Sequence, residues 1–312
     1  MSTNFWEKLK PPIIALAPMA GITDSSWRII CKKLGADVVY TEMVSVAGLC
    51  YSGAKTLSYL KFQKSEHPVV VQLFGSQPEQ FAKAAQIVTR VGFDGIDINF
   101  GCPARKVIKN ESGAVLMDNL TKSYQIIKAV CDNTSLPVSI KMRNSKGLAT
   151  ASQFVEKIKD LPVQAIMIHG RSFEQGFAGD PDWSEIKKVR QIYKGILLAN
   201  GGINTPIKAQ QVISETKVDG LGLAQGVLGK PWLFKQIKDY LVKKKYTEPN
   251  WAKIKPIILK HAKLVINDKG SLIELRKHLL WYVRGHSQAK QLKKELVTVT
   301  TLQDIENILN NY

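Results

Sequence analysis

The sequence predicts a (β/α)8 TIM barrel followed by a small, all-helical C-terminal domain. Eight short apolar runs rich in Val and Ile occur over about 240 residues, and each is followed by apolar residues at helical spacing. Such runs are typical of parallel strands that are covered on both faces. A doubly wound open sheet is the alternative. The barrel is favoured because eight units match its strand number and because no GxGxxG pattern follows the first run.

Turn residues bound the eight runs, which are the expected strands. They span residues 13–18, 37–44, 69–75, 95–101, 138–143, 165–170, 195–202 and 220–226. Between them, residues 78–91 show clear helical spacing. We expect Ser76, Ser152 and Thr205 to cap helices, with Pro206 in the first turn after Thr205.

Beyond residue 241 the strand pattern stops. Residues 246–251 (YTEPNW) predict a linker. Helical spacing follows over residues 251–267 and 271–286, with a shorter pair of helices toward the end. We therefore predict a barrel domain over residues 1–242 and a basic helical domain over residues 243–312.

The chain is strongly basic, with 44 Lys and Arg against 26 Asp and Glu among 312 residues and a formal net charge of +18. The excess is uneven, because residues 241–312 hold 14 basic and 6 acidic residues. A balance of this kind favours an anionic partner.

Cysteine and histidine usage excludes two kinds of site. The four cysteines show no CxxC spacing and the five histidines are scattered, so we expect neither a disulfide framework nor a metal site. No signal-peptide pattern and no apolar run of about eighteen residues occurs, so we expect a cytoplasmic protein without membrane contact.

In a barrel, function concentrates on the loops that follow the carboxyl ends of the strands. Here those positions are polar, small or glycine-rich. They include Pro18, Met19 and Ala20; Gln72; Asn99 and Cys102; Lys141 and Arg143; His169 and Arg171; Asn200, Gly201 and Gly202; and Ala224 and Gln225. We expect these side chains to rim one pocket.

Two features of that rim indicate a phosphate-bearing cofactor. The loops after the seventh and eighth strands of a barrel often form a phosphate site, and Gly201-Gly202 allows close approach of the backbone. Lys141 emerges from an apolar strand, where its charge calls for an anionic partner such as the ring of a reduced flavin. Gln72 suits the same ring edge, whereas His169 alone is equally compatible with a core histidine.

Seven motifs occur in the order seen in tRNA-dihydrouridine synthases. They are APMAGITD (17–24), QLFGSQP (72–78), GIDINFGCPARKV (95–107), SIKMR (139–143), IHGRSFEQGFAGDPDW (168–183), NGGI (200–203) and GVLGKPWLF (226–234). The chain resembles the bacterial B-type branch of that family most closely. The resemblance covers the whole barrel, and the basic helical tail is also of the kind seen in that family.

The resemblance implies FMN at the top of the barrel, with NADPH or NADH as the electron donor. Carried over by position, the FMN-binding residues are Pro18, Met19, Ala20, Gln72, Lys141, His169, Asn200, Gly201, Gly202, Ala224 and Gln225. Cys102 corresponds to the proton donor. The residues implied on the substrate side are Asn99, Arg143 and Arg171.

Two positions depart from the family pattern. Gly202 stands where the family usually has Asp, and Gln225 stands where it usually has Arg. Loss of that arginine removes a charge that would face the phosphate. We expect FMN binding to survive with weaker phosphate contacts, because backbone N–H groups remain.

Cys102 lies between Gly101 and Pro103, in a setting that suits a loop bent over a substrate. A free thiol titrates near pH 8.5, so at neutral pH it is mostly protonated and can donate a proton. No activating base adjoins it in sequence, which favours an acid over a nucleophile. Burial as a small apolar residue is the usual alternative for cysteine.

The implied substrate is a uridine of tRNA that is turned out into the pocket. We expect basic residues after Cys102 and in the tail to contact the RNA backbone, in binding that weakens steeply with salt. They are Arg105, Lys106, Lys109, Lys243, Lys244, Lys245, Arg276, Lys277, Arg284, Lys290, Lys293 and Lys294. We take the protein to be a monomer.

Two other functions remain open at this stage. One is an FMN-dependent barrel reductase of a small pyrimidine or another enone, against which the basic tail argues. The other is a catalytically weakened RNA-binding paralogue, which Gly202 and Gln225 favour but the retained Cys102, Lys141 and Asn99 oppose.

Overall fold

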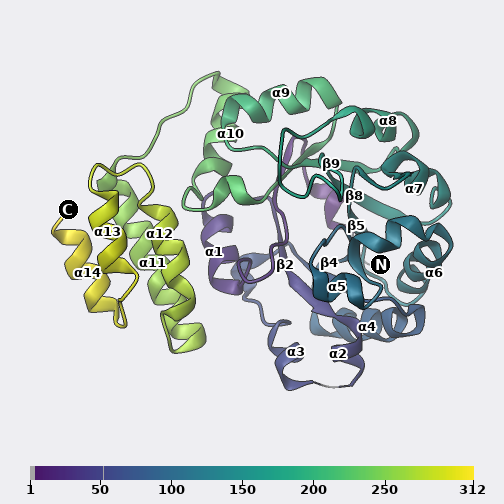
Figure 1. Ribbon diagram of the computed structural model, residues 1–312, viewed down its shortest axis with the longest axis horizontal. Helices are drawn as coiled ribbons and strands as arrows, with labels where there is room; N and C mark the ends of the chain where they lie inside the picture. The colour runs from purple at the N-terminus through teal and green to yellow at the C-terminus, as the bar shows by residue number, and fades with distance from the viewer. Residues whose placement is uncertain (1–3, 52) are drawn as a thin grey trace.

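Eight parallel strands close into a barrel, and their order around the ring follows the chain (Figure 1). The computed structural model describes residues 4–51 and 53–312. The strands are β1 (Ile13–Leu16), β2 (Val38–Ser45), β3 (Val69–Phe74), β4 (Gly95–Phe100), β5 (Val138–Arg143), β8 (Val163–His169), β9 (Ile196–Asn200) and β10 (Gly220–Leu223). Each of the eight predicted runs overlaps one of them, with β2 ending one residue later and β8 beginning two residues earlier than predicted, so the predicted fold class is confirmed.

Helices surround the barrel and bury its outer face (Figure 1). The main ones are α1 (Ser25–Lys33), α4 (Pro78–Val91), α6 (Leu120–Cys131), α7 (Ala151–Lys157), α8 (Ser184–Ile192), α9 (Pro206–Thr216) and α10 (Leu233–Lys243). Helix α4 shows why the sequence folds this way. Its buried residues Phe81, Ala84, Ala85 and Val88 follow helical spacing, and Gly92 ends the helix in a left-handed conformation. β4 is buried along its whole length, as expected of a strand covered on both faces.

Shorter elements occupy the loops. They are α2 (Val46–Cys50), α3 (Ala54–Ser58), α5 (Arg105–Lys109), the two-stranded sheet of β6 (Ser145–Lys146) and β7 (Ala149–Thr150), and the 3₁₀ turns Phe5–Lys8, Lys64–Glu66, Gly113–Asp118, Gln225–Val227 and Ile273–Leu275. The β6–β7 sheet has no counterpart in the sequence prediction. β10 ends three residues before its predicted limit because the 3₁₀ turn Gln225–Val227 follows at once.

One of the three predicted helix caps is confirmed. The Thr205 side chain accepts a hydrogen bond from the N–H of Lys208 at the start of α9. Ser76 is not a cap, because Gln77 takes that position without a side-chain bond. Ser152 lies inside α7, and its hydroxyl donates to Glu185 (2.8 Å). Thr150 caps that helix instead.

Helices alone make up the C-terminal region, as predicted. They are α11 (Trp251–Lys269), α12 (Arg276–Tyr282), α13 (Ala289–Leu296) and α14 (Leu302–Asn310). The region lies beside α1 of the barrel (Figure 1). The predicted boundary at residue 242 falls at the end of α10, and the division into two domains stays a prediction. No helix within the described parts of the chain is long and apolar enough to cross a membrane.

Candidate active site

The carboxyl ends of the strands surround a cavity of about 740 Å³. All residues predicted for the site lie on its wall. They are Pro18, Met19, Ala20, Gln72, Asn99, Cys102, Lys141, Arg143, His169, Arg171, Asn200, Gly201, Gly202, Ala224 and Gln225. Among residues 4–51 and 53–312, no group of His, Cys, Asp and Glu side chains could hold a metal ion.

Asn99, the penultimate residue of β4, shapes the turn that presents Cys102. Its Oδ1 accepts hydrogen bonds from the N–H of Gly101 (3.0 Å) and the N–H of Cys102 (2.9 Å). The carbonyl of Cys102 accepts from the N–H of Ala114 (3.1 Å). The cysteine backbone is therefore held on both sides, and the partly exposed thiol lies on the cavity wall.

A chain of buried polar side chains supports Asn99 from below. Asn99 Nδ2 donates to Gln72 Oε1 (2.9 Å), and Gln72 Nε2 donates to Asp97 Oδ2 (2.7 Å). Ser139 donates to the other oxygen of Asp97 (2.6 Å). These bonds fix which way each amide faces. The sequence prediction missed Asp97, although an acidic residue inside an apolar strand was a visible signal.

Burial raises the pKa of Asp97 to about 6, although its bonds to Ser139 and Gln72 and the charge of Lys141 lower it. Burial likewise lowers the pKa of Lys141 to about 8, and the charge of Asp97 opposes that shift. Lys141 faces the cavity and makes no hydrogen bond to any residue in the described part of the chain. Its charge is thus available to a bound anion below about pH 8.

Arg143 joins two loops of the cavity wall. Its guanidinium donates to the carbonyls of Gly101 (3.0 Å), Ser172 (2.7 Å) and Gly176 (2.9 Å), and it lies 5.7 Å from the ring centre of Phe177. The side chain is buried. Since three carbonyls occupy its donors, Arg143 holds the loop after β8 against the Cys102 turn.

His169 ends β8 next to Arg143 of β5, and with Arg171 it lies beside the turn after β9. Burial, with help from Lys141, Arg143 and Arg171, lowers the pKa of His169 to about 2, so the ring is neutral at physiological pH. Its Nε2 lies 3.4 Å from a guanidinium nitrogen of Arg171 and accepts that bond. Gly201 packs on the same ring, because a Cβ added there would lie 2.4 Å from His169 Cδ2.

The turns after β9 and β10 lie on the cavity wall. Gly201 and Gly202 adopt positive φ angles of 106° and 66°. The N–H groups of Gly201, Gly202, Gln225 and Gly226 donate to no other residue that the structure describes. Successive unpaired N–H groups in such turns are typical of anion-binding sites. Asn200 steadies the first turn, because its Nδ2 donates to the carbonyl of Gly222 (2.7 Å).

Several residues of the wall were not predicted as pocket residues, and three of them bring aromatic or charged side chains to it. Phe177 lies in the loop after β8, with 62% of its surface exposed. Trp281 and Arg284 come from the end of α12 and the turn after it. An aromatic residue in the glycine-rich loop was a usable signal for Phe177. No local pattern indicated that the helical region would reach the cavity.

The sequence has relatives along almost its whole length. One is a protein of Rickettsia conorii named "Probable tRNA-dihydrouridine synthase", 33% identical over 282 residues, which are 87% of this chain and 84% of that protein. Another is "tRNA-dihydrouridine synthase B" of Vibrio cholerae, 31% identical over 309 residues, which are 96% of this chain and 95% of that protein. The latter name agrees with the predicted branch.

Solved structures with low sequence identity share the fold. Morphinone reductase in complex with tetrahydroNAD matches with a TM-score of 0.51 and 12% identity, over 76% of this chain and 88% of that one. An amine oxidase from Pseudomonas geniculata N1 matches with a TM-score of 0.56 and 14% identity, over 82% of this chain and 52% of that one. The sequence model of the family described as dihydrouridine synthase (Dus) matches residues 15–312. The chain therefore belongs to the dihydrouridine synthase family.

Proposed function

We propose that the protein is a tRNA-dihydrouridine synthase, an FMN-dependent oxidoreductase that reduces the C5–C6 double bond of specific uridines in tRNA. Membership of the family and the names of the relatives support this activity. The observation that carries the proposal is the cavity. The family resemblance implies functional residues at the ends of several strands, and all of these residues lie on the wall of the cavity that holds Cys102.

The cavity suits FMN in both size and chemistry. At about 740 Å³ it lies within the range of cofactor sites. We assign the phosphate to the unpaired N–H groups of Gly201, Gly202, Gln225 and Gly226. We assign the polar edge of the ring system to Lys141, a cation inside the barrel end whose ammonium has no hydrogen-bonding partner among the described residues. FMN bound in this way would supply a hydride to carbon 6 of the uracil.

Arg171 is the residue we propose to replace the arginine missing at position 225. Its guanidinium nitrogen Nη1 lies 3.7 Å from the Cβ position that would be built on Gly201, at the phosphate end of the cavity. The Gly179 carbonyl accepts from two other nitrogens of the same group (3.0 and 2.8 Å) and fixes its orientation. The substrate role first given to Arg171 is the alternative.

Cys102 is the proton donor in this proposal. A hydride added to carbon 6 leaves an electron pair that takes a proton at carbon 5, and the Sγ–H bond of Cys102 supplies it. The resulting thiolate regains a proton from water, so the cycle leaves the cysteine unchanged. Asn99 holds the backbone of Cys102 from the same strand end, and its place on the wall lets it contact the uracil as well.

We propose that the RNA lies across the cavity mouth and the helical region, residues 243–312. Helix α5 begins three residues after Cys102 and carries the exposed Arg105 and Lys106. Arg284 of the helical region lies on the cavity wall and is exposed. Arg276 is a weaker candidate than expected, because its guanidinium donates to the carbonyl of Val299 (2.8 Å). The target base must leave its stack at a cost of roughly a few kcal/mol.

The remaining parts of the proposal concern cofactor turnover and cell location. We propose that NADPH, or NADH in its place, enters the same cavity to reduce FMN before RNA binds. The morphinone reductase structure with tetrahydroNAD shows that a protein of this fold holds a nicotinamide derivative. We further propose a monomer that acts in the cytoplasm.

The test uses the purified full-length chain, an unmodified tRNA transcript and NADPH. We expect a flavin absorbance spectrum, its bleaching by NADPH, and a mass gain of two hydrogens at defined uridines by mass spectrometry of RNA fragments. Free uracil and orotate are the controls. Their reduction at rates equal to the transcript would indicate the small-molecule reductase. RNA binding without bound flavin would indicate the weakened paralogue.

A further inference from the structure

The loop after β1 belongs to the cavity wall and to the contact with the helical region at once. Pro18, Met19 and Ala20 line the cavity. The loop then folds on itself, because the carbonyl of Met19 accepts from the N–H groups of Ile22 (3.1 Å) and Thr23 (3.0 Å). It ends at Asp24, which caps α1 by accepting from the N–H of Trp27 (2.9 Å).

Two charged side chains hold the peptide groups of Gly21 at the tip of this loop. Glu42 of β2 accepts a hydrogen bond from the N–H of Gly21. Lys277 of α12, in the helical region, donates to the carbonyl of Gly21. Gly21 has a φ of 72° and no side chain to anchor it. The tip is therefore fixed from one side by the barrel and from the other by the helical region.

A second lysine of the helical region holds the far end of the loop. Lys269, the last residue of α11, lies 2.7 Å from Asp24 Oδ2 and also pairs with Glu274. The carboxylates of Asp24 and Glu274 raise the pKa of Lys269, so the lysine is charged at physiological pH. Asp24 therefore has two separate functions, because one oxygen caps α1 and the other binds Lys269.

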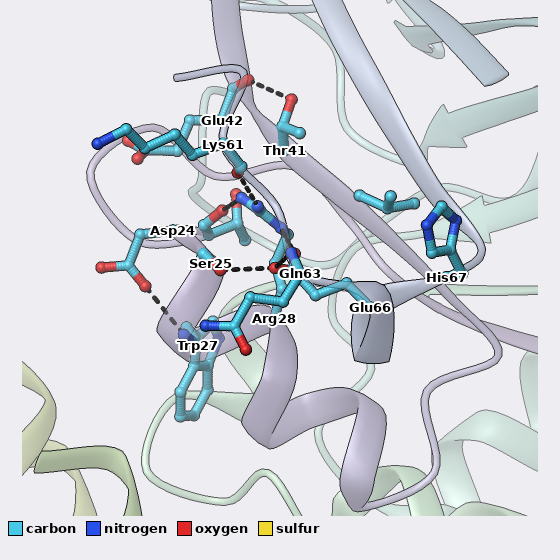
Figure 2. A network of polar contacts seen from close by, with 12 residues as sticks. Asp24, Ser25, Trp27, Arg28, Thr41, Glu42, Lys61, Gln63, Glu66 and His67 are labelled. Carbon is cyan, nitrogen blue, oxygen red and sulfur yellow. Dashed lines mark hydrogen bonds and ion pairs between the residues drawn. The ribbon is translucent and has the colours of Figure 1, made fainter. Parts of the chain in front are cut away.

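The barrel side of this contact is rigid. Figure 2 shows Arg28 of α1 enclosed by Glu66, Ser25 and the loop around Lys61. Arg28 Nε lies 2.5 Å from Glu66 Oε2, and its other nitrogens donate to the carbonyls of Thr23 (2.7 Å) and Lys61 (2.9 Å). Both members of the Arg28–Glu66 pair are buried. Because the base of the loop is anchored in this way, loss of a contact with the helical region should change the loop mainly at its tip.

The lysine contacts cross a hollow part of the interface, not a packed one. Gly21, Asp24, Glu42, Lys269 and Lys277 all line a second cavity of about 450 Å³. Apolar contact between the two parts lies beside it, where Trp27 packs on His261 and His278 with ring centres 5.2 and 4.8 Å apart. Loss of a lysine contact should consequently free the loop while leaving the helical region in place.

We propose that Lys277 and Lys269 are positioning residues for the flavin: from the helical region, they hold the loop after β1 in the shape that lines the cofactor cavity. The inference rests on the proposed FMN function. It gives the helical region a second role besides RNA contact, since full affinity for the cofactor then depends on it. Linkage makes the effect reciprocal, so bound flavin strengthens the same contacts.

The test measures the dissociation constant of FMN for the full-length, flavin-free chain, by quenching of flavin fluorescence and without RNA. We expect Lys277→Ala and Lys269→Ala each to weaken binding about fivefold to tenfold, the lower end of the usual range for coupling between two sites. Lys263→Ala is the matched control. It removes the same charge from an exposed position of α11 that has no partner among the described residues. Lys277→Arg should restore binding, because arginine also donates to a carbonyl.

Two further outcomes are decisive. Asp24→Asn keeps an oxygen for the cap but loses the charge, so its effect and that of Lys269→Ala should not add in the double variant. Additive effects in the double variant, or an FMN affinity of Lys277→Ala equal to that of the wild type, would overturn the inference. Flavin binding by the wild type would in that case still support the proposed function. A wild-type chain that takes up no flavin would overturn both.

Discussion

The two sides of the cavity differ in whether their hydrogen-bonding groups already have partners within the protein. On the side of β3, β4 and β5, the polar groups of Asp97, Gln72 and Asn99 bond to one another and end at the backbone of Cys102. On the side of β9 and β10, glycine turns leave their N–H groups without partners among the described residues. Apart from Lys141, these polar groups of the first side are paired within the protein, whereas the N–H groups of the second remain open to a ligand.

This difference matches the separate requirements of proton donation and phosphate binding. A group that donates a proton has to stand in one place, and a saturated network holds it there. A group that binds phosphate needs donors that nothing else uses. Substitutions of Cys102 and Asn99 should therefore change the rate of reduction at constant flavin affinity, and substitutions in the turns after β9 and β10 should change flavin affinity first.

The largest effect is expected for Cys102→Ala. Removal of a general acid usually costs about a hundredfold to ten-thousandfold in rate. We expect that loss in single-turnover formation of dihydrouridine on a tRNA transcript by the pre-reduced enzyme. Flavin content should stay the same. Cys131→Ala, on the outer helix α6, is the control and should react like the wild type. Normal turnover by Cys102→Ala would show that another group donates the proton.

Gly201→Ala should have the next largest effect, on the cofactor side. The new Cβ would lie 2.4 Å from His169 Cδ2, at a φ of 106°. Strain of about 1–3 kcal/mol corresponds to roughly a fivefold to 150-fold loss of FMN affinity. Fluorescence titration of the flavin-free protein measures it.

Gly92→Ala is the matched control for that substitution. Its φ is 97°, but no atom lies within 4 Å of the added Cβ, and it ends α4 on the outside of the barrel. It should lower the melting temperature and leave FMN affinity unchanged. Equal FMN affinity in both variants would mean that the turn after β9 does not contact the cofactor.

The contrast between the two sides also explains what the sequence could reveal. Strands and their ends follow from apolar runs and from the residues after them, so the barrel and the residues of its rim were predictable. The bonds within the rim were not. Asp97 bonds to Gln72 and Ser139 because β4 lies between β3 and β5, and that neighbourhood exists only in the closed barrel.

Contacts between the barrel and the helical region were also beyond prediction. Lys277 looked like one of many basic residues of the tail, yet it donates to the carbonyl of Gly21. The two residues are 256 positions apart, and no local periodicity relates them.

Ser152 failed as a cap for a more local reason. Thr150 and Gln153 form a capping box two residues earlier than the predicted start.

Arg171→Ala tests whether a side chain assists the backbone on the phosphate side. We expect about a tenfold loss of FMN affinity, as for other charge-assisted bonds, and a smaller loss at high salt. Arg90→Ala, an exposed residue of α4, is the control for net charge. If FMN affinity is unchanged and tRNA affinity falls, Arg171 belongs to the substrate, as the family resemblance implied.

The smallest effect is expected for Asp97→Asn, and it appears only in the pH profile. Lys141 has a lowered pKa of about 8, so a step that needs its charge proceeds below that pH and declines as pH rises through it. The Asp97 carboxylate opposes the shift, and its loss should lower the pKa of Lys141 further. The alkaline limb of the rate of flavin reoxidation by tRNA should then move to lower pH, with the rate near pH 6.5 little changed.

Ser139→Ala separates charge from geometry in that experiment. It removes a hydrogen bond of 2.6 Å from the same carboxylate and leaves the carboxylate in place. With less support for its ionised form, Asp97 gains a higher pKa, but the carboxylate stays charged on the alkaline side, where Lys141 titrates. The alkaline limb should then stay near that of the wild type. A limb that moves equally in both variants would mean that the network acts through the position of Gln72 and Asn99, and that the charge of Lys141 does not set the rate.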